Sequence, residues 1–407
     1  MVSNHAKGKK LVGDILQIST EARKQKQINP NVIDATVGAL YDENAQFYKF
    51  NTVDTLIRNL SDNEFYTYSP SDGGNEYRDA VLKWVFQNER QYVIDNMHCQ
   101  VIATAGGTGA VSNAIYNSCD PGDIILLPDL FWGPYKNMAI TNDLKIEYYP
   151  LLAENKFNIN DFIKMANNII VTQNKFATII NDPCNNPAGY SLTNEELHTV
   201  IDFMNSMPET KFSLIYDIAY FDFSFLGMAK TREKFRILAN AKENVIVNIC
   251  FSASKSFSIY GFRTGAQIIL GKDKEAVDTL YYSSCYLART RWSNVTKAGI
   301  SLLVKITKNE NFYQAVIAEI EKAKELLYLR AATLIKEAEA VNLEIYPYSG
   351  GFFMTIPVNN SNDVFESLKK EGIYTLPFKN AIRVSISALP ISDIKGLALK
   401  IKKTMTS

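Results

Sequence analysis

The segment Ser252-Ala253-Ser254-Lys255 carries the most specific chemical signal in the sequence. Lys255 follows a β-prone apolar run, and Arg263 comes shortly after it, beyond a glycine-containing turn. A lysine in such a place is ordinarily a solvated surface residue. Hydroxyls and a guanidinium gathered around it suit the binding of a phosphate group instead. The segment therefore suggests a lysine that lies close to a bound phosphate.

A glycine-rich stretch at residues 105–110 is a second candidate for phosphate binding. It lies between a β-prone run and a helical pattern. Glycines let backbone N–H groups approach an anion closely, and the N-terminus of the following helix adds its positive dipole end. Taken alone, the stretch fits a phosphate cradle and a plain tight turn equally well.

Two further candidates follow strand patterns. The loop 181–189 is rich in Pro, Asn and Gly. A side-chain amide held between its prolines would fix a ring substituent, but the same composition is typical of an ordinary loop. Asp217 closes a hydrophobic strand, where a carboxylate costs free energy without a cationic partner. A helix cap or turn is the usual explanation, and a protonated ring nitrogen is another. Asn186, Asp217 and Lys255 are spaced by about one strand–helix–strand unit each, so we expect them at one edge of a sheet.

The elements that must position these residues are short apolar runs separated by amphipathic stretches. In residues 195–204, the apolar side chains fall on one helical face. Near-continuous apolar strands between helices predict a parallel sheet covered on both sides. The runs are Ile124–Leu127, Thr178–Ile180, Leu214–Tyr216, Val245–Ile249 and Ala266–Leu270.

The pattern changes after about residue 310 to that of a smaller α+β domain. Its expected elements are a long helix over 312–340, a strand-like stretch over 344–357 with a break at Gly350-Gly351, a helix over 363–370, a strand near 382–387 and a closing helix after residue 392. We therefore expect an N-terminal segment, 1–47, that packs on the small domain or on a partner subunit. A large domain, 48–310, and a small C-terminal domain, 311–407, follow it.

The composition is that of an ordinary soluble globular protein of two domains that acts on small molecules. Among 407 residues, 43 basic and 43 acidic side chains cancel, which predicts neither nucleic acid nor a membrane as partner. The 5 cysteines contain no C-x-x-C pair, and the 3 histidines are scattered, so we expect no disulfide framework and no metal site. With neither a signal-peptide core nor a membrane-length apolar run, we expect a cytoplasmic protein.

These segments, in this order over nearly the whole chain, resemble those of the fold-type-I aminotransferases of class I/II, which depend on pyridoxal 5′-phosphate (PLP). The resemblance is greatest to the aspartate/aromatic branch. It implies an α/β fold in which a large domain binds PLP on a mainly parallel seven-stranded sheet between helices. It also implies a smaller α+β domain formed by the C-terminal part and the N-terminal segment. Lys255 matches the lysine that binds PLP as a Schiff base and moves the substrate proton.

The resemblance also assigns the cofactor contacts. Asp217 matches the carboxylate paired with the pyridine nitrogen, which makes the ring an electron sink. Tyr220 and Asn186 match the groups that hydrogen-bond the ring oxygen. Trp132 matches the aromatic that stacks on the ring, although by itself it would more often be a core residue. The residues matched to the phosphate are Gly107, Thr108, Ser252, Ser254 and Arg263, with Tyr68 reaching the phosphate of a partner subunit.

Three positions match substrate contacts. Arg383 matches the arginine that grips the substrate α-carboxylate bidentately. Gly38 matches a substrate-side glycine near the hinge, where a plain turn fits equally well. Arg289, aligned on the Ser-Asn pair that follows it, matches an arginine that reaches across a dimer to a second carboxylate. Arg291 takes that place if the register slips, and two arginines on a solvated face are the simple alternative.

Some positions depart from the family pattern. Ala188 stands where relatives often have threonine. Tyr135 and Asn185 stand where aspartate aminotransferases commonly carry histidines behind the cofactor. The network that supports Asp217 is therefore expected to differ.

The implied activity is ping-pong transfer of an amino group from an L-amino acid, aspartate and/or aromatic, to a 2-oxo acid such as 2-oxoglutarate, by a homodimer with shared active sites. Another reaction on the same scaffold, such as that of a carbon–sulfur lyase, would use the same lysine, aspartate and arginine. A PLP-binding regulator is the rival from a different class, but the sequence shows no DNA-binding extension or basic patch.

Overall fold

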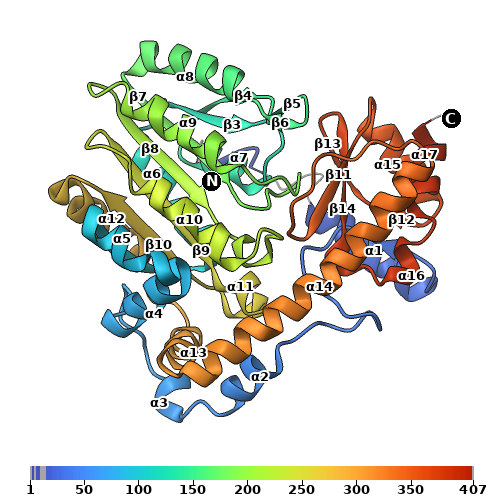
Figure 1. Ribbon diagram of the computed structural model, residues 1–407, viewed down its shortest axis with the longest axis horizontal. Coiled ribbons are helices and arrows are strands. Elements are labelled where there is room, and N and C mark those ends of the chain that lie inside the picture. Colours follow the sequence, from blue (N-terminus) through green and yellow to red (C-terminus); the bar gives the residue numbers. More distant parts are fainter. Residues whose placement is uncertain (1, 4–5, 10–14, 406–407) are drawn as a thin grey trace. The chain divides into compact units, whose positions relative to one another are not determined.

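The computed structural model describes residues 2–3, 6–9 and 15–405 (Figure 1). They form two compact units. The larger unit contains Tyr48–Tyr328 and the short segment Pro347–Phe352. The smaller contains the described residues up to Phe47, Leu329–Tyr346 and the chain from Phe353 on. Across the described residues, no helix combines the length and apolar character needed to span a bilayer.

A seven-stranded sheet forms the centre of the larger unit (Figure 1). Its order is β2-β10-β9-β8-β7-β3-β4. Strands β9, β8, β7, β3 and β4 run parallel, whereas β10 is antiparallel to both of its neighbours. The expected α/β class with a mainly parallel sheet is confirmed. The strands are β2 (His98–Ala105), β3 (Ile124–Pro128), β4 (Lys145–Tyr149), β7 (Lys175–Asn181), β8 (Lys211–Asp217), β9 (Val245–Ser252) and β10 (Thr264–Gly271).

Both faces of this sheet are covered, because successive side chains of each strand point to opposite sides. Ala177 of β7 belongs to a core cluster that includes helix α6 (Gly106–Ser118) on one face. The preceding residue, Phe176, packs edge-on against Phe162 of helix α8 (Ile159–Gln173) on the other face. This double coverage explains why the strands are nearly continuous apolar runs.

Three helices of the larger unit, α8, α9 (Asn194–Asn205) and α12 (Lys274–Arg291), begin at a residue whose side chain caps the helix. Helix α9, expected from its amphipathic pattern, starts with a capping box in which the Thr193 side chain accepts a hydrogen bond from the Glu196 N–H. The remaining elements of this unit are α2 (Asn51–Arg58), α3 (Asp62–Phe65), α4 (Asn75–Phe86), η2 (Gln87–Glu89), α5 (Arg90–Asn96), α7 (Pro134–Thr141), β5 (Leu152–Ala153), β6 (Lys156–Phe157), η3 (Phe221–Phe223), α10 (Met228–Leu238), α11 (Ala253–Ser256), η4 (Tyr260–Phe262) and α13 (Lys297–Lys308). Helix α14 (Glu310–Ala340) begins in the larger unit and ends in the smaller one.

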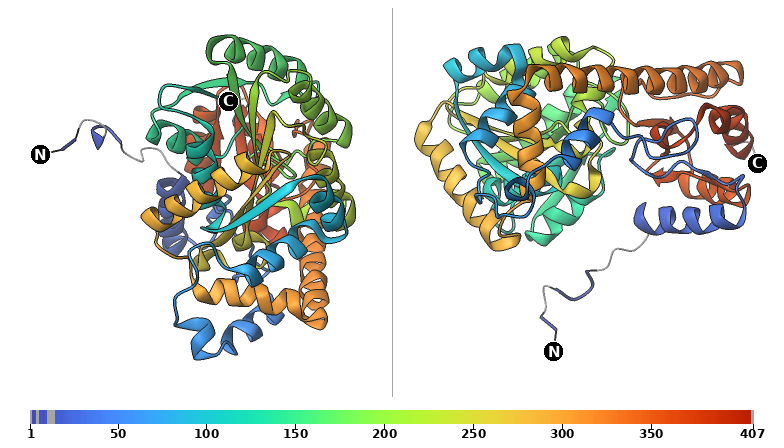
Figure 2. Two further views of the ribbon diagram at one scale, coloured as in Figure 1. Left: turned by 90° about the vertical axis from the view of Figure 1, so that its left-hand side faces the viewer. Right: turned by 90° about the horizontal axis from the view of Figure 1, so that it is seen from below.

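The smaller unit combines an antiparallel sheet, β11-β14-β13, with a parallel pair, β1-β12. In the right-hand view of Figure 2, the blue helix α1 (Ile15–Ile28) lies beside the red C-terminal elements of this unit. In the parallel pair, Ile33 of the N-terminal segment lies in register with Ile373, so the two ends of the chain share this unit. The stretch expected to be a strand over 344–357 is one only from Phe353, because Gly350 and Gly351 have φ of 132° and 84°. The elements are α1 (Ile15–Ile28), β1 (Ile33–Asp34), β11 (Phe353–Pro357), α15 (Ser361–Lys370), β12 (Ile373–Tyr374), β13 (Leu376–Phe378), β14 (Ala381–Ser385), η5 (Ile386–Ala388), α16 (Ile391–Ile394) and α17 (Leu397–Met405).

Candidate active site

One cavity of the larger unit brings the four sequence segments together. It lies at the carboxyl ends of β7, β8 and β9 and the N-terminus of α6, and it holds ≈ 620 Å³ of empty space, part of it open to solvent. That is the place where parallel α/β sheets bind ligands. Within the described residues, no group of three or more His, Cys, Asp or Glu side chains gathers as a metal site would require. The lining residues are Gly107, Thr108, Trp132, Tyr135, Asn181, Asn186, Asp217, Ala219, Tyr220, Ser252, Ser254, Lys255, Tyr260 and Arg263.

Lys255 is half-buried in α11, the short helix that follows β9. Its Nζ lies 4.7 Å from the ring centroid of Tyr260 and 5.4 Å from that of Tyr220. The ring of Phe352, from the segment Pro347–Phe352, is 5.7 Å away. Aromatic faces attract an ammonium group, and they also remove part of its hydration. The half-buried side chain of Lys255 therefore lies among aromatic rings at the wall of the cavity.

Asp217 ends β8 and is 4% exposed. Its Oδ2 accepts a hydrogen bond of 2.5 Å from the Tyr135 hydroxyl, and its Oδ1 accepts one of 3.0 Å from the Ala219 N–H. Burial raises the pKa of this carboxyl to about 6, against the lowering effect of the two hydrogen bonds and of the Lys255 charge. A buried carboxylate with so high a pKa suits a ligand that brings a positive charge.

Donors of hydrogen bonds gather at the start of α6. Arg263 adopts a left-handed backbone conformation (φ 51°), and its Nη1 lies 3.1 Å from the Ser254 Oγ. A Cβ on Gly106 would lie 2.5 Å from the Arg263 Nη2, and one on Gly107 would lie 3.1 Å from the Ser252 Cβ. Glycine is therefore needed for this close approach. Hydroxyls, a guanidinium and a helix N-terminus together form a cradle for a phosphate.

The loop after β7 supplies Asn186 to the cavity. The Asn186 N–H donates to Asn181 Oδ1 (2.7 Å), and Asn181 Nδ2 donates to the Asp217 carbonyl oxygen (2.8 Å). The peptide bonds Asp182–Pro183 and Asn186–Pro187 are cis. Asn181 thus links the loop to the end of the neighbouring strand.

All of the residues matched to the cofactor, except Tyr68, line this cavity. Tyr68 is 90% exposed. Trp132 packs edge-on against Tyr135, with ring centroids 5.4 Å apart. Of the two positions expected to replace histidines, Tyr135 contacts Asp217, whereas the Asn185 side chain accepts a hydrogen bond from Ala188. It is Asn181 that bonds to the Asp217 backbone.

Three lining residues were not assigned a site role from the sequence: Asn181, Ala219 and Tyr260. Ala219 and Tyr260 lie within a few residues of Asp217 and Lys255, so the motifs already contained them. Asn181 closes its strand as Asp217 closes the next one, in register with it. A search for polar residues at strand ends would have found it.

The matched substrate residues lie elsewhere. Arg383 is 2% exposed in β14 of the smaller unit, where its Nη2 donates to the Thr36 carbonyl oxygen (2.6 Å) and its guanidinium lies 3.9 Å from the Phe353 ring centroid. Gly38 belongs to the same unit. Arg289 is exposed on α12 and donates to the Ser293 hydroxyl (2.8 Å).

The Arg291 side chain contacts helix α6 of the same chain. Its Nη1 donates to the Ser112 hydroxyl of α6 (2.9 Å), and its guanidinium lies 5.1 Å from the Tyr116 ring centroid. Arg289 and Arg291 therefore have different surroundings, although only one residue separates them.

Taken together, a lysine among aromatic rings, a buried carboxylate and a phosphate cradle at one edge of a mixed seven-stranded sheet define a PLP-binding enzyme. The chain belongs to the family "Aminotransferase class I and II", whose model matches residues 30–401. PLP is the cofactor of this family; the hydrogen-bond donors of the cavity fit its phosphate, and the Asp217 carboxylate, an acceptor, fits its protonated ring nitrogen.

The chain is similar over its full length to the crystal structure of an aminotransferase from Anaerococcus prevotii, with 28% identity, 100% coverage of both chains and a TM-score of 0.95. An aromatic-amino-acid aminotransferase of Burkholderia pseudomallei, covalently bound to pyridoxal phosphate, has the same fold, with 19% identity, 99% and 100% coverage and a TM-score of 0.80. The aromatic-amino-acid aminotransferase of Escherichia coli is 24% identical over 66% of each chain. The match thus spans just under two thirds of that relative's length.

Proposed function

We propose that the protein transfers an amino group from an L-amino acid, aspartate and/or an aromatic one, to a 2-oxo acid such as 2-oxoglutarate, by a ping-pong mechanism. One observation carries the proposal. A single cavity gathers Lys255, the buried carboxylate of Asp217 and the donors at the start of α6. The relatives with the names aromatic-amino-acid and aspartate aminotransferase support the substrate class.

PLP, when bound, supplies an electron sink that stabilises negative charge at the substrate Cα. Lys255 is the group that takes the proton from this carbon and returns it, and its Nζ lies among the rings of Tyr220 and Tyr260. Asp217 holds the proton of the ring nitrogen, because a cation beside the buried carboxyl favours its ionised form.

The other residues of the cavity bind and orient. Thr108, Ser252, Ser254 and Arg263 anchor the phosphate, and Gly107 lets the backbone approach it. Asn186 and Tyr220 hold the ring oxygen, and Trp132 covers a face of the ring. All of them line the same cavity, which supports these roles. Fixing the ring at both ends aligns the reacting carbon with Lys255.

On the substrate side, we assign the α-carboxylate to Arg383 and a neighbouring contact to Gly38. A second carboxylate is assigned to Arg289 of a partner subunit, and the partner's phosphate to Tyr68. These assignments require a homodimer with shared active sites. The exposure of Tyr68 and Arg289, neither of which lines the cavity of its own chain, is consistent with them. The free cysteines support a reducing compartment such as the cytoplasm.

Product stoichiometry tests the activity. The PLP-loaded protein is mixed with a panel of amino acids, with and without 2-oxoglutarate, and the 2-oxo acid formed is counted per PLP. We expect one equivalent without the acceptor and continued turnover with it. Continued product formation without the acceptor would indicate a lyase. Binding of PLP without reaction of any amino acid would indicate a regulator.

A further inference from the structure

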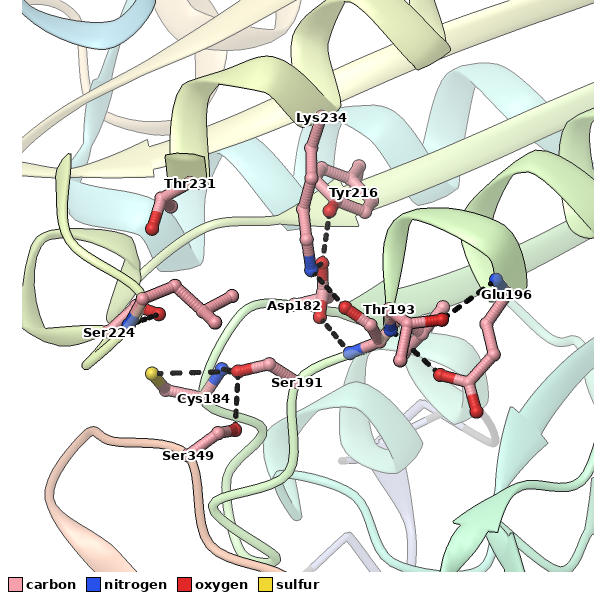
Figure 3. A network of polar contacts seen from close by, with 12 residues as sticks. Asp182, Cys184, Ser191, Thr193, Glu196, Tyr216, Ser224, Thr231, Lys234 and Ser349 are labelled. Atoms are coloured by element: carbon pink, nitrogen blue, oxygen red, sulfur yellow. Dashed lines mark hydrogen bonds and ion pairs between the residues drawn. The ribbon is translucent and has the colours of Figure 1, made fainter. Parts of the chain in front are cut away.

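The larger unit buries an ion pair that the proposed chemistry does not use. Lys234 of α10 is 1% exposed, and Asp182, which follows β7, is 0% exposed. Lys234 Nζ lies 2.6 Å from Asp182 Oδ2, and the Tyr216 hydroxyl donates to the same oxygen (Figure 3). Burial and the Asp182 charge raise the pKa of Tyr216 well above its usual range, so its phenol stays a donor.

The pair holds both ends of one loop. Asp182 begins the loop 182–192, and its Oδ1 accepts a hydrogen bond from the Leu192 N–H (2.7 Å) at the other end. Lys234 Nζ donates to the Leu192 carbonyl oxygen (2.7 Å). Inside the loop, the Ser191 Oγ accepts from the Cys184 N–H (2.9 Å) and from the Ser349 hydroxyl (2.8 Å), as Figure 3 shows.

The same loop carries Asn186 into the cavity. The Asp182 N–H donates to the Asp217 carbonyl oxygen (3.1 Å), beside the bond from Asn181 to that oxygen. Tyr216, which binds Asp182, is the residue before Asp217. The ion pair is therefore connected to Asn186 through the loop, and to Asp217 through a backbone hydrogen bond and through Tyr216. We assign both residues to the PLP ring.

A buried ion pair is a weak source of stability, because the cost of removing two charges from water is comparable to their attraction. An apolar pair of similar volume would often serve a core as well. The charged pair adds directional hydrogen bonds, since Asp182 accepts from three groups, on α10, on β8 and at the end of the loop. These bonds join the two ends of the loop to each other and to α10 and β8.

We propose that Lys234 is a positioning residue, which acts through Asp182 to fix the loop 182–192 so that Asn186 keeps its place on the PLP ring oxygen. The inference rests on the proposed function, since Asn186 is assigned to PLP there. It predicts that loss of the pair weakens PLP binding and displaces the pH at which the absorbance of bound PLP changes, while the fold remains.

The test uses the full chain and PLP itself. Lys234→Met leaves the Asp182 charge buried and unpaired, which destabilises the fold. The double variant Lys234→Met/Asp182→Asn removes both charges at similar volume, and it is the decisive protein. We expect it to melt within a few degrees of the wild type, to bind PLP at least about tenfold more weakly, as loss of an outer-shell partner typically does, and to show a displaced pH midpoint.

Phe235→Leu is the matched control. Phe235 is the next residue of α10 and is equally buried, but it packs against Phe86, 5.0 Å between ring centroids. This variant should lose melting temperature and keep the wild-type PLP affinity and pH midpoint. The inference is overturned if the double variant has the wild-type affinity and midpoint, or if Phe235→Leu changes both as much as the double variant does. A wild-type protein that binds no PLP would overturn the proposed function as well, which separates the two failures.

Discussion

At the scale of single residues, the burial of Asp217 lowers the stability of the PLP-free protein when its carboxyl is ionised. Asp217 is buried with only hydrogen-bond donors and the charge of Lys255 to compensate it, and its pKa is raised to about 6. Under our proposal, this carboxylate is the partner of a cationic ring nitrogen and is buried before that cation binds. Function and stability therefore oppose each other at this position.

The pH dependence of stability follows from that shift. In the unfolded chain, an aspartate titrates near its ordinary value of 3.8, and in the folded PLP-free protein Asp217 titrates near 6. Because the folded pKa is raised, the contribution of Asp217 to stability is complete below about pH 4 and is lost as the pH rises through about 6. We expect the PLP-free variant Asp217→Asn to be more stable than the wild type above pH 7, by about 2–3 kcal/mol.

Urea unfolding of the PLP-free proteins between pH 5 and 8 measures this difference. The advantage of Asp217→Asn should grow from pH 5 to 7 and then stay constant. Asp202→Asn, a charge change at an exposed position on α9, controls for net charge. A difference between Asp217→Asn and the wild type that does not vary with pH would contradict the account of this residue.

At the scale of elements, the site is formed by the carboxyl ends of strands and the N-terminus of a helix. Asp217 is the last residue of β8, Asn186 lies in the loop after β7 and Lys255 in the short helix after β9, and α6 turns its N-terminus to the same cavity. Gly106 makes the approach of α6 possible, because its φ is +68° and a Cβ there would meet Arg263. The phosphate cradle therefore depends on backbone geometry as much as on side chains.

Gly106→Ala tests that dependence. The added Cβ must displace the Arg263 guanidinium, and loss of one charge-assisted contact should weaken PLP binding by about tenfold or more. Gly122→Ala is the matched control, since Gly122 also has a positive φ (+93°) but no atom within 4 Å of the added Cβ. Both variants should lose stability through strain. Equal PLP affinities in equilibrium titrations of the two would show that Gly106 serves only a turn.

Local patterns predicted most of the strands and the segments that line the cavity. Apolar runs predict the strands because both faces of the sheet are buried, and the spacing of Asn186, Asp217 and Lys255 predicts their common edge. The direction of β10 could not be predicted, because an apolar run reads the same in a parallel and an antiparallel strand. The contact of Tyr135 with Asp217 joins residues 82 positions apart, and only the packing of α7 decides it.

At the scale of the whole molecule, our proposal assigns the second carboxylate of the substrate to Arg289 of a second subunit. Arg289 is exposed in the single chain and is held there only by the side chains of its own helix end, Ser293 and Asn294, among the bonds described. Arg291, by contrast, is held by α6. A homodimer that places Arg289 at the partner's cavity would give that cavity a second arginine for dicarboxylic substrates.

Arg289→Ala should lower kcat/KM for aspartate and glutamate by about 10–100-fold, the loss expected of one charge-assisted contact. Aromatic donors should lose much less, since they carry no second carboxylate. Half-reactions measure both without the 2-oxoglutarate step, and Arg291→Ala is the control. Equal losses for aspartate and phenylalanine would show that Arg289 is structural.

The central claim is that PLP bound in this cavity is attached to Lys255, and borohydride reduction followed by peptide mass spectrometry tests it most directly. The purified protein should be yellow, and reduction should abolish its visible absorbance and leave a phosphopyridoxyl group on the peptide that contains Lys255. A group found on another lysine, or on none, would contradict the claim.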